Sequence, residues 1–363
     1  MNIKETQPVT LPSQMATTDR TLAEGYSRFV LYRVLILILM VVLLGVAFVF
    51  DVFTGPAPLS PDSVIAGLFD PAGLPGPVHY ILFNVRLPYA VMAGLVGASL
   101  GLAGAEMQTV LNNPLASPFT LGVSAAATLG AALVLVTGIT LTWFPQEALL
   151  PTSAFLFAAV AALLIHLLAK TQSNGADSVV LFGIALVFAI NSVVALLQFL
   201  ADADTLQQIV FWGMGSLGRS TWPKIATVAV VLIIAIPLSL RNVWKLTALR
   251  AGEAQAESLG IDTKRLRLTV MLRASLLAAV AVCFVGTIGF VGLVGPHIAR
   301  LLLGEDHRFF LPGAALAGAL ILSLASIASK TIIPGMIIPL GIVTSIVGVP
   351  LFLSLLVAKE HRA

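Results

Sequence analysis

The chain has 363 residues, of which 58% are hydrophobic and only 10% are charged, with a mean hydropathy of +1.01. Soluble domains carry about a quarter of their residues as charged side chains, so this composition excludes an ordinary soluble protein. It predicts an all-α polytopic membrane protein, and the net charge of +3 gives no reason to expect a nucleic-acid partner.

The first 28 residues are polar and lack the short basic start and early apolar core of a cleaved signal peptide. We expect residues 1–28 to form a cytoplasmic N-terminal tail. A membrane domain is expected over 29–358 and a second cytoplasmic tail over 359–363.

Apolar runs long enough to cross a hydrocarbon core of about 30 Å recur along the chain between polar, proline or glycine interruptions. They predict about ten membrane-spanning helices, over 29–50, 87–110, 118–137, 149–169, 179–201, 223–240, 268–287, 290–303, 310–329 and 338–358. The stretch 268–303 is too long for one helix and short for two. Its glycines at 286, 289, 292 and 295 and the following Pro296 predict a turn and a shortened eighth helix.

The second predicted helix carries small residues at every fourth position, namely Ala93, Gly97, Gly101 and Ala105. This spacing is typical of helices whose backbones approach closely in lipid. Glu106 is the only carboxylate well inside a predicted span. Two interpretations stay open for it: a gating or proton-linked group, or a carboxylate that reaches the inner interface or bonds a neighbouring helix.

The segment 112–130, NNPLASPFTLGVSAAATLG, separates the second and third predicted helices. Pro114 lacks an amide donor and biases Asn113 away from helix, while Asn112 and Asn113 can hydrogen-bond freed backbone groups. Ser117 predicts an N-cap for the next helix. A tight turn alone accounts for these residues.

The loop 241–267 is the longest inner loop between the predicted spans. Within it, Glu253–Leu259 is expected to be helical with little apolar surface, Gly260 to end that helix, and Asp262 or Thr263 to cap a second one. A basic loop lying on lipid headgroups is the alternative, but three acidic residues dilute its charge. A broken helix pair of this kind is typical of a docking element for another protein.

Basic residues are distributed unevenly between the two sides of the predicted bundle. With ten spans and a cytoplasmic N-terminus, the inner side holds 16 of the 20: Lys4, Arg20, Arg28, Arg33, Lys170, Arg241, Lys245, Arg250, Lys264, Arg265, Arg267, Arg273, Arg300, Arg308, Lys359 and Arg362. The outer side holds Arg86, Arg219, Lys224 and Lys330. The positive-inside bias therefore predicts that both termini are cytoplasmic.

The sequence offers little for chemistry on its own. Its five histidines fall in no metal-ligand spacing, no GxxxxGK[ST] phosphate loop is present, and the single cysteine, Cys283, lies in an apolar segment where we interpret it as core packing. The scarcity of ionisable groups in the spans argues against a membrane-embedded enzyme and, less strongly, against an ion-coupled secondary carrier.

Six segments in order resemble the FecCD-type family, the permease subunits of ATP-binding-cassette (ABC) importers for iron-siderophores, haem and vitamin B12. They are RLPYAVMAGLVGASLGLAGAEMQ at 86–108, NNPLASPFTLGVSAAA at 112–127, FWGMGSLG at 211–218, GEAQAESLGI at 252–261, GFVGLVGPHIARLLLGEDHRFFLP at 289–312 and IPLGIVTSIVGVPLFLSLL at 338–356. The resemblance runs from about residue 80 to the C-terminus. It implies the type II ABC importer permease-like fold, with ten helices per subunit.

The resemblance also implies roles for particular residues. Asn113, Pro114 and Leu115 match part of the family's cytoplasmic gate. The coupling helices, at about 250–264, match at Gly252, Glu253, Ala254, Ala256, Glu257, Leu259, Gly260 and Ile261. Arg86 and Lys330 match outward basic residues that dock the binding protein through exposed ion pairs. Tyr89 departs from the family pattern, which often has a second arginine there.

The family works as a dimer around a pathway lined largely by its fifth and tenth helices. On that resemblance Asn191, Ser192, Gln198 or the segment 341–350 are candidates to face the pathway.

The implied function is transport. The chain would be a permease subunit, not an enzyme, that moves an iron-siderophore or similar metal complex across the bacterial inner membrane by alternating access. A permease for haem or cobalamin and an ion-coupled secondary transporter are the alternatives. The implied partners are two cytoplasmic ABC ATPase subunits, a periplasmic or lipid-anchored substrate-binding protein, and a second permease copy or paralogue. The chain is expected to hold no cofactor or metal, because ATP is used by the partner subunit.

Overall fold

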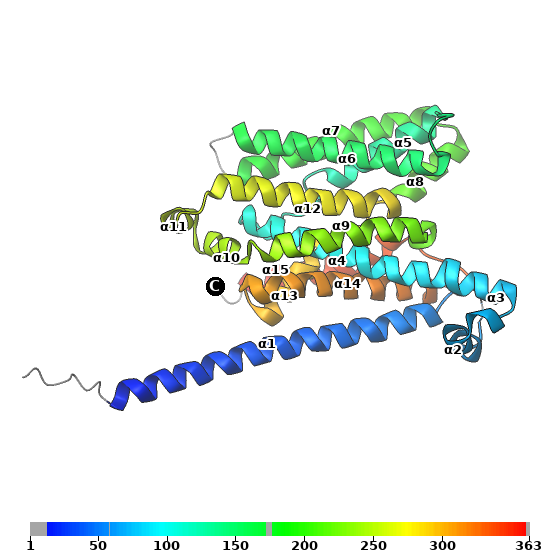
Figure 1. Cartoon of the computed structure of the whole chain (residues 1–363). Helices are drawn as coiled ribbons and strands as arrows, with labels where there is room; N and C mark the ends of the chain where they lie inside the picture. The colour runs from blue at the N-terminus through cyan, green and yellow to red at the C-terminus, as the bar shows by residue number, and fades with distance from the viewer. Residues whose placement is uncertain (1–12, 58, 172–175, 361–363) are drawn as a thin grey trace, which may run out of the picture.

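Helices account for all the regular structure in the computed structural model, which describes residues 13–57, 59–171 and 176–360 (Figure 1). Seven helical stretches are long and apolar enough to cross a membrane. They contain α1 (Ser13–Phe53), α4 (Leu87–Val110), α6 (Gln146–Thr171), α7 (Ala176–Leu200), α9 (Trp222–Leu240), α12 (Thr263–Val285) and α14 (His307–Thr331). Shorter apolar helices are α5 (Val123–Thr137), α13 (Val291–Leu303) and α15 (Leu340–Glu360). Together they confirm the predicted membrane fold of about ten helices.

The remaining helices gather at the two ends of the bundle (Figure 1). At one end, called the α2 end, are α2 (Pro61–Phe69), η1 (Pro71–Gly73), α3 (Gly76–Tyr80), the π-helical turn η2 (Ile81–Arg86), α8 (Ala203–Gly213) and η3 (Leu217–Arg219). At the other, called the α11 end, are α10 (Val243–Ala251) and α11 (Glu253–Ser258). The two ends are the places where this chain can present polar surface on either side of a membrane.

Helix α4 is the centre of the packing and lies against α14, α12 and α13. Helix α1 runs along α14 at one side of the bundle, while α5, α6 and α7 form the opposite side (Figure 1). Of the 24 residues of α4, most are buried, including every residue from Ser99 to Val110. The helix is therefore enclosed over its second half as a core element would be in a soluble protein.

Glycines bring the α4 backbone into direct contact with its neighbours. A Cβ at Gly97 would overlap with the Gly318 carbonyl of α14, and one at Gly104 would overlap with the backbone of Gly292 in α13. Backbones can approach this closely only where no side chain intervenes. The close packing predicted from the small-residue repeat is confirmed, and Gly104, which lies outside that repeat, belongs to the same contact.

The predicted break between the seventh and eighth spans is also confirmed. Helix α12 ends at Val285, and Gly286 has a φ of +80°, which favours glycine. Helix α13 begins at Val291 and has 13 residues. Phe290, just before it, has a φ of +66°, an unusual conformation for a bulky residue.

Two boundaries differ from the sequence-based expectation. Helix α1 begins at Ser13 rather than at Phe29, because its polar first part still consists mainly of residues compatible with a helix. Residues 13–28 thus continue the first span as helix, while residues 1–12 and 361–363 of the predicted tails lie outside the described residues.

The third span starts later than predicted. It begins at Val123, because Gly122 has a left-handed φ of +87° and ends the preceding turn. The Ser117 hydroxyl accepts a hydrogen bond from the Thr120 amide at 3.2 Å, so it caps this turn. The prediction that Ser117 is the N-cap of the helix itself is wrong.

The glycine contacts make opposite predictions for two substitutions in α4. Gly101→Ala should lower the thermal unfolding midpoint of the detergent-purified protein, because the added methyl group overlaps with the Ala314 carbonyl and overpacking costs about 1–3 kcal/mol. Gly94→Ala should leave the midpoint unchanged or raise it, because Gly94 has open space and alanine favours the helix by about 1 kcal/mol. Equal midpoints for the two variants would contradict the close packing.

Candidate functional site

The α11 end is built around a helix break that the sequence specifies with two glycines. Gly252 has φ +138° and ψ +146° and separates α10 from α11, and Gly260 has φ +77° after α11. The Asp262 carboxylate then accepts a hydrogen bond from the Arg265 amide at 2.9 Å and caps α12. The predicted helix stop at Gly260 and the predicted cap at Asp262 are both confirmed.

Most of α11 is exposed. Of its six residues only Ala256 is fully buried, whereas Leu259, just beyond the helix end, is 56% exposed. Leu259 lies beside acidic and small residues on a segment that protrudes from the bundle, where another protein can reach it. The structure thus places Glu253, Ala254, Glu257, Leu259 and Gly260 together on one protruding element.

The inner face of α11 is held to the bundle by hydrogen bonds. The Thr263 hydroxyl lies 3.2 Å from Glu253 Oε1 and 3.0 Å from Glu257 Oε1. Arg267 donates from Nη2 to Glu253 Oε2 at 3.3 Å and from Nε to the Val110 carbonyl at 3.0 Å. Arg267 therefore connects α11 to the end of α4.

The polar turn that follows α4 lies beside this element. Asn112 has a φ of +43°, a conformation that asparagine tolerates better than most residues. The Asn113 side chain accepts a hydrogen bond from the Leu115 amide at 2.9 Å, which forms an Asx-turn around Pro114. Pro114 and Leu115 are exposed at the surface.

Arg250 joins the α10–α11 element to this turn. It donates from Nη1 to Asn112 Oδ1 at 2.6 Å and from Nη2 to Glu305 Oε1 at 2.8 Å. Arg300 lies 3.4 Å from the same Glu305 carboxylate. The hydrogen bond from Arg250 is the main reason why the pKa of Glu305 is lowered from its ordinary value, so the carboxylate is charged at neutral pH.

His307 adds a second, buried connection at the same end. Its Nε2 lies 2.9 Å from the Thr109 hydroxyl of α4, and its Nδ1 lies 3.1 Å from the Thr247 hydroxyl of α10. A neutral imidazole has one donor and one acceptor, so it can bond both hydroxyls at once. Three segments that are distant in sequence, α4, α10 and α14, meet at this ring.

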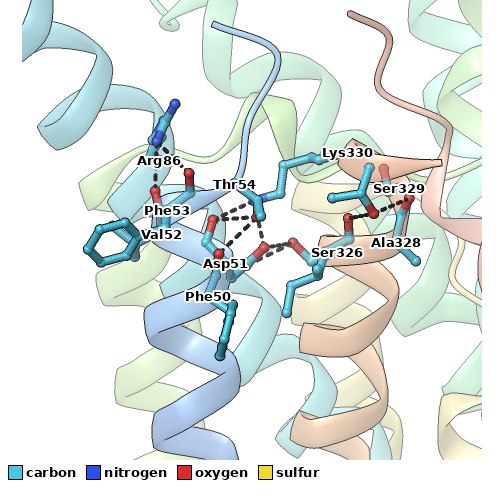
Figure 2. Close-up of polar contacts among 12 residues, drawn as sticks. Phe50, Asp51, Val52, Phe53, Thr54, Arg86, Ser326, Ala328, Ser329 and Lys330 are labelled. Atoms are coloured by element: carbon cyan, nitrogen blue, oxygen red, sulfur yellow. Dashed lines mark hydrogen bonds and ion pairs between the residues drawn. The ribbon is translucent and has the colours of Figure 1, made fainter. Parts of the chain in front are cut away.

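The α2 end contains a second polar cluster, at the C-terminal end of α1 (Figure 2). Arg86 donates from Nη1 to the carbonyls of Val52 and Phe53 at 3.1 and 3.0 Å, and from Nη2 to Ala57 at 2.6 Å. The carbonyls of Val52 and Phe53 end α1 and have no intrahelical donor, whereas Ala57 lies in the loop after the helix. Arg86 therefore caps α1.

Asp51 and Lys330 form a buried ion pair in the same cluster (Figure 2). Lys330 Nζ lies 2.5 Å from Asp51 Oδ1 and donates to the Asp51 carbonyl at 2.8 Å, while the Ser326 hydroxyl donates to the carboxylate at 2.7 Å. Lys330 Nζ also lies 4.7 Å from the centre of the Tyr89 ring. An arginine at position 89, which is frequent in the family, would place a second cation beside Lys330, whereas Tyr89 is uncharged.

The expectation that Arg86 and Lys330 are exposed is corrected by this cluster. Their residues are only 4% and 7% exposed, because each cation is directed inward by acceptors of α1 and the loop after it. The expected contact of these two residues with a binding protein stays a prediction, whereas their attachment of α1 to α4 and α14 is visible in Figure 2.

Glu106 is also part of a buried ion pair. Its carboxylate is fully buried and accepts hydrogen bonds from Arg273 Nε at 3.1 Å, with Arg273 Nη2 closing the bidentate contact. Of the alternatives left open by the sequence, the structure shows a bond to a neighbouring helix, α12. Arg273, counted among the inner basic residues, lies within that helix and not in a loop.

A cavity of about 390 Å³ opens where α8, the α12–α13 break and the start of α15 meet. It is lined by Met214, Thr287, Phe290 and the predicted segment 341–350, through residues such as Ile346. Asn191 and Ser192 of α7 are exposed, and Gln198 is half-buried. None of these three α7 residues lines this cavity.

Sequence reasoning found the turn and the α11 element but missed the residues that join them. Glu305 and His307 lie within the family-like segment 289–312, and Arg250 begins the predicted coupling region. Their partners are up to 198 residues away in sequence, so no local spacing indicates these contacts. The cap at Asp262 and the two glycines could be identified because they act within a few residues of their own position.

Comparisons with known proteins place the chain in a wider group. A family model described as the FecCD transport family matches residues 35–358. The Fe(3+)-citrate import system permease protein YfmE of Bacillus subtilis is 36% identical over 90% of this chain and 96% of its own length. The hemin transport system permease protein HmuU of Yersinia pestis is 33% identical over 78% of this chain and 85% of its own.

A solved structure shares the fold. It is an inward-facing conformation of a protein described as a metal-chelate type ABC transporter, with a TM-score of 0.77 and 31% sequence identity. The match covers 89% of this chain and 99% of that chain.

The buried ion pair at the α2 end predicts that removing one of its two charges destabilises the protein more than removing both. Lys330→Met should lower the free energy of unfolding by about 3–5 kcal/mol, because it leaves the Asp51 carboxylate buried without its cation. The double variant Asp51→Asn with Lys330→Met should regain most of that loss, because no buried charge is left unpaired. Unfolding of the purified variants in detergent measures both effects, and a Lys330→Met protein as stable as the original would contradict the structural role.

Proposed function

Because the chain belongs to the FecCD transport family, we propose that it imports an iron-siderophore or a similar metal complex across the bacterial inner membrane by alternating access. The chain is a permease subunit and not itself an enzyme. The metal-complex class is supported by the relatives, which include permeases named for ferric citrate and hemin. Permeation of haem or cobalamin is the alternative within the same family.

The α10–α11 element supports the proposal that separate ATPase subunits drive transport. It protrudes from the bundle, exposes Leu259, and is joined through Arg250 to the turn at Asn112. In this proposal two ATPase subunits bind α11 from the cytoplasm, and their ATP-driven movement reaches the gate at 113–115 as a rigid-body shift. ATP is used by those subunits, and this chain holds no cofactor of its own.

The orientation follows from the same assignment. The α11 end faces the cytoplasm together with both termini, which agrees with the positive-inside bias. The α2 end then faces the periplasmic side, where a periplasmic or lipid-anchored binding protein delivers the substrate. A second permease, either a copy or a paralogue, pairs through the side that contains α7 and α15, and the cavity beside 341–350 opens toward the pathway between them.

The buried carboxylates favour this proposal over an ion-coupled carrier. Asp51 pairs with Lys330, and Glu106 pairs with Arg273, so both acids have a fixed cation within their own helix bundle. A carboxylate that binds and releases a coupling ion during transport requires a site that can lose its partner. These pairs instead connect helices α1 with α14 and α4 with α12.

Reconstitution tests the function directly. Liposomes that contain the chain, its ATPase and its binding protein should take up a ferric siderophore only when ATP is supplied to the ATPase side. The chain alone should take up none when a proton or sodium gradient is applied. Uptake driven by an ion gradient without the ATPase would overturn the proposal in favour of a secondary carrier.

The docking element can be tested with two matched substitutions. Leu259→Glu should abolish copurification of the ATPase without lowering the unfolding midpoint, because Leu259 is exposed on α11 and makes no core contact. Leu68→Glu should leave copurification intact, because Leu68 is similarly exposed but lies in α2 at the opposite end. Retention of the ATPase by the Leu259→Glu protein would remove α11 from the docking surface.

Arg250 should be needed for coupling and not for docking. Arg250→Ala removes the hydrogen bonds to Asn112 and Glu305, and charged hydrogen bonds contribute about 1.5–3 kcal/mol each. ATP hydrolysis by the assembled complex should persist while uptake per ATP falls by about tenfold or more. Arg265→Ala, which removes an exposed arginine at the same end, is the control and should keep normal coupling.

A further inference from the structure

A large apolar groove lies on the side of the bundle where α1 packs against α14 and α4. It has a volume of about 690 Å³ and is formed by α1, α4, α9 and α14. Its lining is almost entirely hydrocarbon, and it includes Gly45 of α1 and Gly94 of α4, both with open space where a side chain would be. A volume far above the roughly 30 Å³ of one water molecule can hold an extended apolar molecule.

The groove runs along helices that span the membrane, so its surroundings are lipid. On α1 it extends from Val41 to Phe48, and on α4 from Ala90 to Leu102. At 1.5 Å per residue the α4 stretch alone is about 18 Å long, slightly more than the roughly 15 Å of one leaflet's hydrocarbon. The length and the apolar lining fit one acyl chain of a phospholipid.

Cations stand at the α11 end of this groove. Leu240 of α9 lines the groove, and the next residue, Arg241, is exposed. Pro312 of α14 lines it as well, and Arg308, one helical turn earlier, has a side chain that is 52% exposed. Arg308 also donates from Nη1 to the Tyr26 hydroxyl at 3.0 Å, so the cation lies between the start of α14 and α1.

Further charged residues and an aromatic ring lie near the same end of the groove. Lys245 is exposed one turn after Arg241, while Asp306 is the carboxylate paired with Arg308. Three cations against one carboxylate leave this end of the groove positive. Trp244, also exposed, is a residue type that favours the level of the lipid headgroups.

We propose that this groove binds an anionic phospholipid, with one acyl chain between α1, α4, α9 and α14 and its phosphate against Arg241 and Arg308. Basic pockets between membrane helices recognise anionic headgroups in this way. No residue of α11 and none that lines the cavity beside 341–350 lines the groove, so the inference does not depend on the transported substrate.

Native mass spectrometry of the full-length, delipidated protein tests the site with two lipids of identical chains, phosphatidylglycerol and phosphatidylcholine. One molecule of phosphatidylglycerol should bind per chain, and more tightly than phosphatidylcholine. Arg241→Gln and Arg308→Gln should each weaken phosphatidylglycerol binding by about fivefold while binding of phosphatidylcholine is unchanged. Equal affinity of the original protein for both lipids would overturn the assignment of an anionic headgroup.

Filling the groove tests the position of the acyl chain. Gly94→Leu places a side chain in the groove and should reduce binding of either lipid by on the order of tenfold or more, because several buried methylenes are lost. Gly76→Leu is the matched control, because Gly76 of α3 also has open space but lies at the α2 end, outside the groove lining. Gly45→Leu repeats the test from the other wall if Gly94→Leu does not fold. Binding by the folded filled variants that equals the control would overturn the proposal.

Discussion

The direct contact between the backbones of α4, α14 and α13 is the constraint on which the rest of the structure depends. At Gly97 and Gly104 the helices meet without intervening side chains, so α4 cannot turn or slide without displacing both neighbours. Helix α4 also connects the two ends of the molecule. Arg86 directly precedes it at the α2 end, and the polar turn at 112–115 follows it at the α11 end.

Polar contacts extend this rigid centre outward at each end. At the α2 end, Asp51, Lys330 and Arg86 attach α1 to α14 and to the start of α4. At the α11 end, Arg250 and His307 attach α10 to the α4 end and to the start of α14. Buried ion pairs contribute little net stability in general, but breaking one is costly, so they fix which helices are neighbours. The exposed α11 is thus joined by hydrogen bonds to this closely packed centre.

The mechanical consequence is that movement imposed on α11 is not absorbed locally. Arg267 connects α11 to the Val110 carbonyl, and Arg250 connects α10 to Asn112, so one contact reaches the end of α4 and the other reaches the turn after it. Coupling between sites requires such contiguous contacts and an element with two positions. In the proposed function, the element that changes position is the whole subunit relative to a second permease, and the proposed gate opens between the two.

The sequence predicted those structural features that depend on neighbouring residues or on a repeated spacing. The helices, the small-residue face of α4, the break after Val285 and the stop at Gly260 each depend on nearby residues. The burial of Arg86 and Lys330 could not be predicted, because it depends on acceptors in α1 that only the folded chain brings close. The pairing of Glu106 with Arg273 was hidden for the same reason, since 167 positions separate the two residues.

Spin labels on α11 and on the gate turn provide the most direct test of this rigid connection. With labels at Ser258 and Leu115, both exposed, the distance within one chain should change by less than about 2 Å when ATP binds the assembled importer. The distance between Leu115 labels on the two permease subunits should change by more. A change within the chain as large as the change between subunits would show that α11 moves independently of the bundle and would contradict the account.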